Sequence, residues 1–413
     1  MILRLLLFIV MLLSTSLSPA HAGSCSGANP NDNTPDDDAL QSCLDSGGAV
    51  TLDAGSPGYI IATGLLFSVA NTVLTSTDTN DRATLIAHAD LNTQILRTSG
   101  VSGLQLLAIK LDGNKANRTA TCRGYRGNGT NISLFDGDGW KLINIESSRA
   151  LCGTALEISG TNYEIANSQF YSNGYSTGQR GGEPWADGIT LAYCQGGYVH
   201  DNYLEDSTDI AIVSGGTGGY GCRVENNTIH QTNNHAFAGI AVHNFVEGGT
   251  GGGDHTNSLY QNNTITSALN QLDLGISVGM HGWFSDRDTF GGSIINNSVS
   301  GARINLDIYG YHDGTVNNNT ISSPQGSFFG FGANYAATNV TNTCLQLGWV
   351  VKAVSIVNSS TSDTEETITS TCGGLPPSPP PTSASLTLAL DTSYDASGMA
   401  GYGVERYCGA DTR

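Results

Sequence analysis

Two aspartates in the middle of the chain have the residue type and the spacing that acid–base chemistry needs. Asp187 lies in the segment Trp185-Ala-Asp-Gly-Ile189, and Asp209 follows 22 residues later in Thr208-Asp-Ile-Ala-Ile-Val213. If one turn of a coiled chain takes that many residues, the two carboxyl groups stack at about 4.8 Å, the spacing of neighbouring strands. Two carboxylates so close cannot both ionise freely, so the pKa of one rises. The pair then supplies the proton donor and the base that cleavage of a glycosidic bond requires.

A structural interpretation of these aspartates stays open beside the catalytic one. Both lie where a strand is expected to begin, and an aspartate there often accepts hydrogen bonds from backbone N–H groups of a turn. Asp206 lies just before the second segment and is a further candidate for a catalytic carboxyl. Sequence alone does not decide between these roles.

Three histidines fall in the same third of the chain. His243 follows Gly239-Ile-Ala-Val242, and His281 follows Gly275-Ile-Ser-Val278-Gly-Met. Because the two runs are alike, we expect these histidines to end equivalent strands and to share a face with the aspartates, as general acids or bases. The residues that we expect to bind substrate are His235, Trp283, Arg303, Asn305, Asp307 and Tyr309.

Metal and cofactor chemistry is not indicated by any motif. The spacing of His and Cys matches no zinc site, and no acidic run matches a calcium loop. The chain has no phosphate-binding loop, no Gly-x-Ser-x-Gly sequence and no dinucleotide motif in a suitable context. We therefore expect neither a metal nor a cofactor, with calcium entering only if the protein is a lyase.

A weak repeat built around asparagine runs through the centre of the chain. Each asparagine is followed by a short alternating run such as Gly239-Ile-Ala-Val242, which predicts a strand. The shorter intervals, 22 to 25 residues, suit one coil of a parallel β-helix, and the longer ones, 34 to 36 residues, add a loop. We expect the asparagines to form ladders at equivalent corners. The aligned asparagines are residues 144, 167, 202, 227, 263, 297 and 319.

The composition agrees with a β-rich chain and excludes several function classes. Glycine makes up 53 of 413 residues and charged residues only 13%, whereas about 7% and 25% are usual. Many glycines and few charges favour strands and turns over a helical bundle. The formal net charge of −19 disfavours a nucleic-acid partner, because phosphate binding needs a basic surface.

The N-terminus has the features of a secretory signal over residues 1–22. Arg4 is followed by the apolar run Leu5–Leu13 and by the cleavage-site pattern Ala20-His-Ala22. No later apolar run is long enough for a membrane span. We therefore expect a secreted protein made of a solenoid domain, a proline-rich linker and a short tail. The expected bounds are 23–374 for the solenoid, 375–385 for the linker and 386–413 for the tail.

Nine cysteines remain after the signal, in an oxidising compartment where disulfides form. Sequence does not fix their connectivity. Joining sequence neighbours predicts Cys25–Cys43, Cys122–Cys152, Cys194–Cys222 and Cys344–Cys372, with Cys408 left over.

The region from about residue 30 to 350 resembles the right-handed parallel β-helix proteins of the pectate-lyase-like superfamily. The resemblance rests on Asp38-Ala-Leu-Gln41, Gly47-Gly-Ala-Val-Thr-Leu52 and Leu111-Asp-Gly-Asn-Lys-Ala-Asn-Arg118. It implies an all-β fold, a single right-handed parallel β-helix. The acidic segment Asp36-Asp-Asp-Ala-Leu40 predicts a short helix that caps the first coil.

Local similarity to polygalacturonases is weaker. The segments around Asp187 and Asp209 resemble the Asn-Thr-Asp-Gly-Ile and Asp-Asp-x-Ile-Ala-Ile-x-Ser-Gly patterns of that family. Thr208 stands where the family has the first aspartate of its pair, and the family's Gly-His-Gly is absent. Arg303-Ile-Asn305 resembles the family's Arg-Ile-Lys with the lysine replaced.

These features favour a secreted, monomeric carbohydrate-active enzyme that hydrolyses a polysaccharide by paired carboxyl groups. Uronate-containing polysaccharides are among the candidate substrates. One alternative is a polysaccharide lyase or uronate epimerase on the same fold, with the histidines as bases. Another is a non-catalytic β-solenoid that binds a surface, which the proline-rich linker and short tail also fit.

Overall fold

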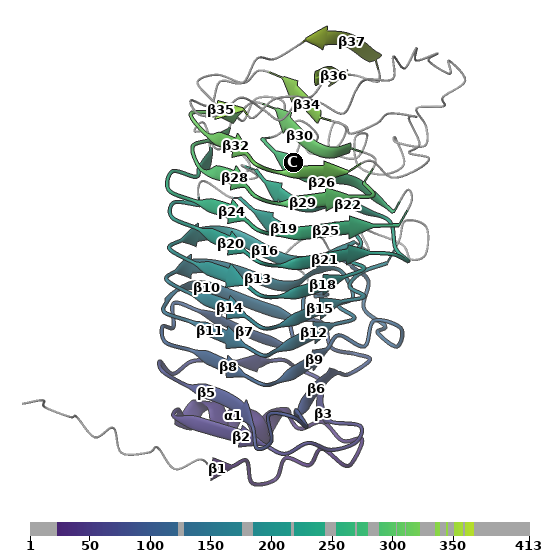
Figure 1. The fold of residues 1–413 in the computed structure, drawn as a ribbon. Helices are drawn as coiled ribbons and strands as arrows, with labels where there is room; N and C mark the ends of the chain where they lie inside the picture. Colours follow the sequence, from purple (N-terminus) through teal and green to yellow (C-terminus); the bar gives the residue numbers. More distant parts are fainter. Residues whose placement is uncertain are drawn as a thin grey trace, which may run out of the picture.

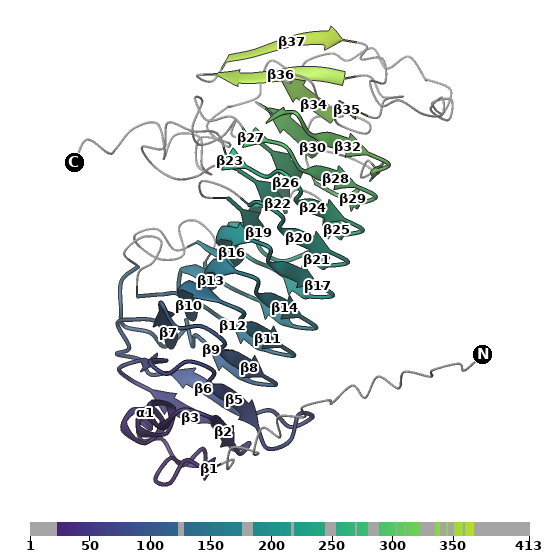
Figure 2. The ribbon, with the colours of Figure 1, turned by 90° about the vertical axis from the view of Figure 1, so that its left-hand side faces the viewer.

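The chain forms an elongated stack of short parallel strands. Most coils contribute one strand to each of three parallel sheets, so the strands of a sheet follow one another along the stack (Figures 1 and 2). The expected right-handed parallel β-helix with a short N-terminal helix is confirmed. This computed structural model describes residues 23–122, 128–175, 185–215, 219–243, 253–268, 271–279, 289–302, 304–309, 311–322, 335–338, 344–345, 351–357 and 360–366.

Three large sheets wrap the core, and two of them have ten strands. We name the ten-stranded sheet with the longest strands the wide sheet and the other ten-stranded sheet the narrow sheet. The wide sheet consists of β4 (Leu65–Leu66), β7 (Leu96–Ser99), β10 (Ile132–Asp138), β13 (Gly153–Thr161), β16 (Ala186–Gln195), β19 (Ile210–Ser214), β22 (Ala236–Val242), β26 (Leu272–Val278), β30 (Ile304–Tyr309) and β34 (Tyr335–Thr338). The narrow sheet consists of β3 (Tyr59–Ile61), β6 (Thr84–Ala87), β9 (Lys110–Asp112), β12 (Glu146–Ser148), β15 (Gln169–Tyr171), β18 (Tyr203–Glu205), β21 (Thr228–Gln231), β25 (Thr264–Ser267), β29 (Ser298–Ser300) and β33 (Thr320–Ser322).

The third large sheet has twelve strands, and two small sheets complete the fold. The twelve-stranded sheet consists of β1 (Gly23–Ser24), β2 (Ala49–Leu52), β5 (Val73–Ser76), β8 (Gln105–Leu107), β11 (Lys141–Ile143), β14 (Glu164–Ala166), β17 (Tyr198–His200), β20 (Arg223–Glu225), β24 (Leu259–Gln261), β28 (Ser293–Ile295), β32 (Thr315–Asn317) and β35 (Cys344–Leu345). The small sheets are β23 (Gly253–Asp254), β27 (Thr289–Phe290) and β31 (Tyr311–His312), and the antiparallel pair β36 (Val351–Val357) and β37 (Ser360–Glu366).

Aliphatic side chains hold the coils together from inside. Because side chains alternate between the two faces of a strand, equivalent inward residues of successive strands stack on one another. A fully buried Leu or Ile side chain contributes about 1.5–3 kcal/mol, and each coil obtains this burial only from its neighbours. The described members of one inward column of the wide sheet are Leu65, Leu96, Ile132, Leu156, Ile189, Ile212, Ile240, Ile276 and Leu306.

A buried asparagine ladder fixes one corner of the stack, as the sequence predicts. The Asn227 Nδ2 donates to the Val199 carbonyl oxygen at 3.0 Å and to the Asn263 Oδ1 at 3.0 Å. Its own Oδ1 accepts the Asn202 backbone N–H at 3.1 Å. The residue before each ladder asparagine takes a positive φ, which Asn and Asp tolerate. The described ladder members are Asn202, Asn227, Asn263, Asn297 and Asn319.

The first two asparagines of the sequence alignment are corrected by one position. Asn144 and Asn167 have φ values of 55° and 52°, so they occupy the turn position that precedes the ladder. The ladder position itself holds Ile145 and Ser168. The Asn202 Oδ1 accepts the Ser168 N–H at 3.0 Å, and the Ser168 Oγ accepts the Ile145 N–H at 3.1 Å. The repeat therefore continues with a shorter side chain at the same corner.

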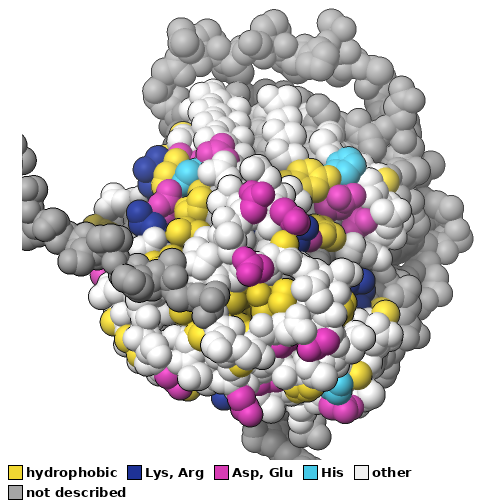
Figure 3. All heavy atoms as spheres, turned by 90° about the horizontal axis from the view of Figure 1, so that it is seen from below, with side chains coloured by type: hydrophobic (Ala, Val, Ile, Leu, Met, Phe, Trp, Pro, Cys, Tyr) yellow, Lys and Arg dark blue, Asp and Glu magenta, His cyan; other side chains and the backbone are white. Residues whose placement is uncertain are grey.

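The helix α1 (Asp37–Ser46) closes the N-terminal end of the stack. Its side chains Leu40 and Leu44 are 2% and 1% exposed and complete the apolar core. The Asp37 carboxylate accepts hydrogen bonds from the backbone N–H groups of Ala62, Thr63 and Gly64, which ties the helix to the segment between β3 and β4. Seen from this end, the surface is mainly polar, with only scattered hydrophobic atoms (Figure 3).

Three of the four expected disulfides are confirmed: Cys25–Cys43, Cys122–Cys152 and Cys194–Cys222. The fourth involves Cys372, which lies outside the described residues, as do the expected signal, linker and tail. Among the described residues, no helix is long and apolar enough to cross a membrane.

Candidate functional site

The two aspartates expected to form a pair lie on adjacent strands of the wide sheet. Asp187 is the second residue of β16, and its side chain is fully buried. The Thr190 hydroxyl donates to its Oδ2 at 2.6 Å, and the Ile210 N–H donates to its Oδ1 at 3.1 Å. Asp209 directly precedes β19 and is partly exposed, and its N–H donates to the Ala186 carbonyl oxygen at 3.2 Å. The aspartates are therefore offset by one residue along the strands.

The environment of Asp187 favours its protonated form. Burial raises its pKa well above the ordinary value, and the charge of Asp209 raises it further. The hydrogen bonds from Thr190 and Ile210 act in the opposite direction, and the charge of the buried Glu157 on β13 adds a smaller upward effect. A buried carboxyl that keeps its proton beside a partly exposed one can act as a proton donor.

Asp206, the third expected carboxyl, has an evident structural role. Its φ is 52°, and its Oδ1 accepts the Thr232 and Asn233 backbone N–H groups at 2.7 and 2.9 Å. Burial raises the pKa of Asp206, but the hydrogen bonds outweigh this effect and the pKa lies below its ordinary value. Asp206 thus holds the turn after β21 as a carboxylate, which is the turn-forming role expected as the alternative for aspartates here.

His243 and Asp307 meet through a serine that the sequence analysis did not single out. His243 directly follows β22, and its Nε2 lies 2.9 Å from the Ser277 Oγ on β26. The Ser277 Oγ donates to the Asp307 Oδ2 on β30 at 3.4 Å. Burial lowers the pKa of His243 to about 3 and raises that of Asp307 to about 7. The imidazole is therefore neutral, and the carboxyl titrates near neutrality.

A cluster of apolar side chains, which we name the outer patch, separates the His243–Ser277–Asp307 group from the Asp187–Thr190 group. It consists of the buried residues Ile210, Val213, Ala238 and Ala241, with Phe237 and Leu274 packed against it. The register Thr190–Val213–Ala241–Ser277 places three strand spacings between the two polar groups. That separation is about 14 Å. The structure therefore does not bring His243 and Asp307 into contact with Asp187.

His235 pairs with a carboxylate that the sequence analysis also missed. Its Nε2 lies 3.1 Å from the Asp273 Oδ1, and both side chains are 15% exposed. Asp273 lies on β26, and β22 begins directly after His235. The expected substrate-binding residue His235 therefore holds an acidic partner close to the carboxyl pair.

Of the remaining expected site residues, only Asn305 has a side chain that the structure describes. Asn305 is buried, and its Oδ1 accepts the Ala302 N–H at 3.1 Å, so it stabilises the turn before β30. His281, Trp283 and Arg303 lie outside the described residues, as does the side chain of Tyr309. Within the described ranges no cluster of three or more His, Cys, Asp or Glu side chains could hold a metal ion.

Thr190, Ser277 and Asp273 can be found from the sequence if the coils are aligned residue by residue on their buried isoleucines. Asp273 stands three residues before Ile276, as Asp209 stands three residues before Ile212. Ser277 and Thr190 each follow the buried isoleucine of their own strand. Polar residues at equivalent points of neighbouring coils meet in space, because strand register is kept from coil to coil.

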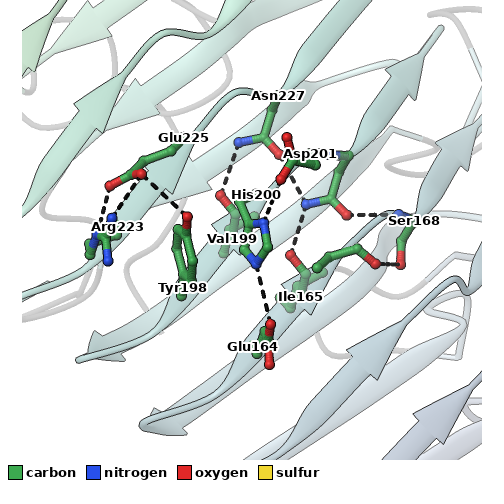
Figure 4. Close-up of polar contacts among 12 residues, drawn as sticks. Glu164, Ile165, Ser168, Tyr198, Val199, His200, Asp201, Arg223, Glu225 and Asn227 are labelled. Carbon is green, nitrogen blue, oxygen red and sulfur yellow. Dashed lines mark hydrogen bonds and ion pairs between the residues drawn. The ribbon is translucent and has the colours of Figure 1, made fainter.

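A different polar network covers the twelve-stranded sheet on the same coils (Figure 4). The Arg223 guanidinium donates to the Glu225 carboxylate at 2.6 and 2.9 Å and lies 4.3 Å from the centre of the Tyr198 ring. That ring stacks on His200, whose Nδ1 lies 2.7 Å from the Asp201 Oδ2. We name this the surface network: Glu164, Tyr198, His200, Asp201, Arg223 and Glu225.

Comparison with known proteins identifies the fold. No protein-family model and no curated protein matches the sequence. Solved structures that match include the A-module of the mannuronan C-5 epimerase AlgE4 of Azotobacter vinelandii, with 14% identity over 77% of this chain and 86% of that one, at a TM-score of 0.54. The polygalacturonase of Erwinia carotovora ssp. carotovora is 13% identical over 81% of this chain and 97% of that one, at 0.52.

A viral protein is as similar as these enzymes. The N-terminal fragment of gene product 12 of bacteriophage phi29 is 14% identical over 78% of this chain and 57% of that one, at a TM-score of 0.55. Since one fold carries all three proteins, the function must be inferred from the residues of the wide sheet.

Proposed function

We propose that this protein is a carbohydrate-active enzyme that hydrolyses glycosidic bonds of a polysaccharide on the outer side of the wide sheet. The observation that carries the proposal is the carboxyl pair: buried Asp187, which favours its proton, directly beside partly exposed Asp209. Fold neighbours named as a polygalacturonase and a mannuronan epimerase support a polysaccharide as the substrate.

The two aspartates have different roles in this proposal. Asp209 is partly exposed, so it is the carboxyl that meets the glycosidic oxygen. Asp187 is fully buried behind it, and it acts as a positioning residue that keeps a proton available to the pair. Thr190 and the Ile210 N–H hold the Asp187 carboxyl in one orientation.

Export of the protein as a monomer belongs to the same proposal. The apolar N-terminal segment and the Ala20-His-Ala22 pattern support secretion. The three disulfides agree with an oxidising compartment. No nucleic acid is expected as a partner, because the net charge is −19.

The test is a panel of polygalacturonate, alginate, xylan and β-glucan digested with the mature protein, with and without calcium. New reducing ends and the ultraviolet absorbance of unsaturated uronates are read in the same wells. We expect reducing ends without absorbance for the wild type, and at least a 100-fold lower rate for Asp209→Asn, since acid–base groups contribute about 10²- to 10⁴-fold.

Glu225→Gln is the matched control, because it removes a carboxylate from the surface network on the same coils. Its rate should stay within twofold of the wild type. Absorbance with reducing ends would instead identify a lyase, and unchanged activity of Asp209→Asn would remove the carboxyl pair from the mechanism. No cleavage of any panel member would favour a binding solenoid.

A further inference from the structure

The corner that joins the twelve-stranded sheet to the narrow sheet repeats one short motif on four successive coils. There β20, β24, β28 and β32 turn into β21, β25, β29 and β33 (Figure 1). Each turn consists of an asparagine, the ladder asparagine and a Thr or Ser that opens the next strand. Asn-x-Ser/Thr is the acceptor motif of N-linked glycans. The four asparagines that begin the motif are Asn226, Asn262, Asn296 and Asn318, and the hydroxyl residues are Thr228, Thr264, Ser298 and Thr320.

Both ends of this motif are accessible on all four coils. The first asparagine has a φ between 55° and 57°, and its side chain is exposed. The hydroxyl residue two positions later is exposed too. Within the described ranges, the side chains of these residues make no hydrogen bond. The amide nitrogen of each first asparagine is therefore open to modification.

Three further matches to the motif in the described chain are engaged by the fold. Asn128 and Asn131 are buried, and the Asn131 Nδ2 donates to the Ser148 carbonyl oxygen at 2.9 Å. At the third match, the Asn117 Nδ2 donates to the Asn114 Oδ1 at 2.7 Å. A bulky substituent on such a nitrogen would displace the groups around it. The fold therefore singles out the corner motifs as acceptors.

The strand surface beside these motifs differs in charge from the rest of the narrow sheet. Earlier strands of this sheet carry partly exposed Lys110, Glu146 and Glu205. On β21, β25 and β29 the described outward residues include no Asp, Glu, Lys or Arg. Charged side chains keep a protein surface soluble, and surface glycans do the same. The outward residues of these three strands are Thr228, His230, Thr264, Thr266, Ser298 and Ser300.

The spacing of the coils limits how many motifs can carry a glycan at once. The Asn226 N–H donates to the Gln261 carbonyl oxygen at 3.1 Å, and the Asn262 N–H donates to the Ile295 carbonyl oxygen at 3.3 Å. Successive acceptors therefore follow one another at one strand spacing, about 4.8 Å. A branched glycan is wider than this spacing. Alternate coils, about 9.6 Å apart, leave more room.

The corner lies away from the face where cleavage is proposed. It joins the two large sheets other than the wide sheet. Glycans attached here extend from that corner and leave the outer side of the wide sheet uncovered.

We propose that this corner carries N-linked glycans, on at most two of Asn226, Asn262, Asn296 and Asn318 and never on neighbouring coils. The inference rests on the export that belongs to the proposed function, because acceptor motifs are used in secreted chains. In the transfer, the asparagine Nδ2 forms a bond to the anomeric carbon of an oligosaccharide carried on a lipid diphosphate. The bond from that carbon to the diphosphate oxygen breaks, and its electron pair leaves with the diphosphate. The Nδ2 gives up one proton to solvent.

The decisive measurement is the intact mass of the full chain, isolated from its own source, before and after treatment with peptide-N-glycosidase. We expect a mass above that of the polypeptide by one or two glycans, and loss of this excess on treatment. The enzyme converts each glycosylated asparagine to aspartate, so peptide mapping locates the sites. A mass that equals the polypeptide before treatment would overturn the inference, as would glycans confined to Asn117, Asn128 or Asn131.

One tryptic peptide tests the exclusion between neighbouring coils. No Lys or Arg lies between Arg223 and Arg287, so trypsin releases residues 224–287 as a single peptide that contains Asn226 and Asn262. We expect this peptide with one glycan or none. The same peptide with two glycans would contradict the exclusion, because both acceptors would then be occupied in one molecule.

Variants of one hydroxyl residue test the motif itself. Thr264→Val keeps the shape of the side chain and should abolish modification of Asn262, whereas Thr264→Ser keeps the hydroxyl and should preserve it. The matched control is Thr266→Val, an outward residue of the same strand that belongs to no motif. It should leave the glycan pattern unchanged. Modification of Asn262 in Thr264→Val would show that the motif is not what is recognised.

The outcomes separate this inference from the proposed function. If the protein cleaves a polysaccharide of the panel and carries no glycan, the inference fails and the proposed function stands. If the protein carries glycans at the corner and cleaves no panel member, the inference stands and the hydrolase proposal fails. A protein that is retained in the cell without glycans removes the inference together with export, and cleavage by the recovered protein then decides the hydrolase proposal independently.

Discussion

The outer sides of two sheets carry carboxylates on the same coils, but they surround them differently. On the twelve-stranded sheet, Glu225 accepts two hydrogen bonds from Arg223, and His200 lies between Asp201 and Glu164. On the wide sheet, Asp187 faces the charge of Asp209 and lacks such an ion pair. The surface network pairs Glu225 with a cation, whereas Asp187 and Asp209 place like charges together, although Asp273 further along the wide sheet is paired with His235.

The difference has a physical meaning. Carboxylates that pair with cations stay ionised without large changes of their pKa. An exposed pair of this kind contributes little to the free energy of unfolding. A buried carboxyl beside another is costly to keep charged, so it holds a proton at a pH where ordinary carboxyls have lost it. Groups of the second kind cluster at functional sites. The contrast between the two sheets therefore locates the chemistry on the wide sheet.

The largest effect is expected from Asp187→Asn, which tests whether the like-charge pair of the wide sheet is needed for cleavage. The asparagine keeps the shape of the side chain and removes the proton that Asp187 holds beside Asp209. We expect a rate about 100-fold lower at neutral pH with little change in KM. Without Asp187, the remaining carboxyl loses its proton more readily, so the alkaline limb of the pH profile should move to lower pH. The measurement is kcat against pH on the cleaved polysaccharide.

The control for this variant is Glu225→Gln on the opposing surface network. If both variants reduced the rate equally, or if neither did, the like-charge pair would have no special role and Asp187 would be a structural residue of the strand.

The second prediction concerns the polar groups that hold the solenoid rather than act on substrate. Asn263 is fully buried, and its amide contacts Val224, Asn227 and Asn297. Asn263→Ala leaves the Asn227 N–H without its acceptor. Because each buried unsatisfied group costs about 1–3 kcal/mol, we expect a loss of roughly 3 kcal/mol in the free energy of unfolding.

Chemical denaturation measures this loss, with Thr264→Ala as the control, since Thr264 is the exposed next residue. A loss below about 1 kcal/mol for Asn263→Ala would mean that the ladder adapts to a missing member.

The sequence predicts the repeated parts of this molecule better than the site. The alternating runs around Ile212, Ile240 and Ile276 and the asparagines from Asn202 onward specify coils because every copy meets the same copy above it. The first two asparagines were misaligned, because an αL turn and a ladder corner both favour Asn and lie one residue apart.

The site depends on details that a repeat pattern does not contain. Asp187 is buried and Asp209 partly exposed because they occupy coil positions one residue apart, Asp187 being equivalent to the buried Ile210. His243 and Asp307 are linked through Ser277, a residue type that is common in such strands. The apolar pattern does not point to Asp273, because this residue stands just before the repeated run Gly275-Ile-Ser-Val278 rather than within it.

The third prediction uses Asp307, whose pKa is raised by burial from 3.8 to about 7. A proton is then bound more tightly by the folded than by the unfolded chain, so the free energy of unfolding falls as pH rises from about 4 to about 7. Asp307→Asn removes this dependence and should stabilise the protein above pH 7 by on the order of 2 kcal/mol.

The comparison is between the wild type and Asp307→Asn at pH 5 and pH 8, by chemical denaturation. His243, with its lowered pKa, adds an opposite slope below about pH 6.5, and this slope is common to both proteins. A variant that is less stable than the wild type at pH 8 would show that Asp307 is held as a paired carboxylate, like those of the surface network.

The smallest effect is expected from Arg223→Ala, which removes the ion pair with Glu225 and the contact with the Tyr198 ring. Arg223 is 48% exposed, although Glu225 is only 5% exposed, so the ion pair is screened on one side by water. Exposed ion pairs contribute about 0.2–1 kcal/mol, and an exposed cation–π contact about 0.5–1 kcal/mol. We therefore expect a loss near 1 kcal/mol in the free energy of unfolding. This loss should shrink in 1 M salt, because screening weakens the ion pair in the wild type.

Polysaccharide cleavage by Arg223→Ala should be unchanged, since the removed charge lies on the twelve-stranded sheet. If Arg223→Ala had normal stability and reduced cleavage, the active site would have to be placed on the twelve-stranded sheet. Substrate would then contact the ion pairs of the surface network rather than the carboxyl pair of Asp187 and Asp209.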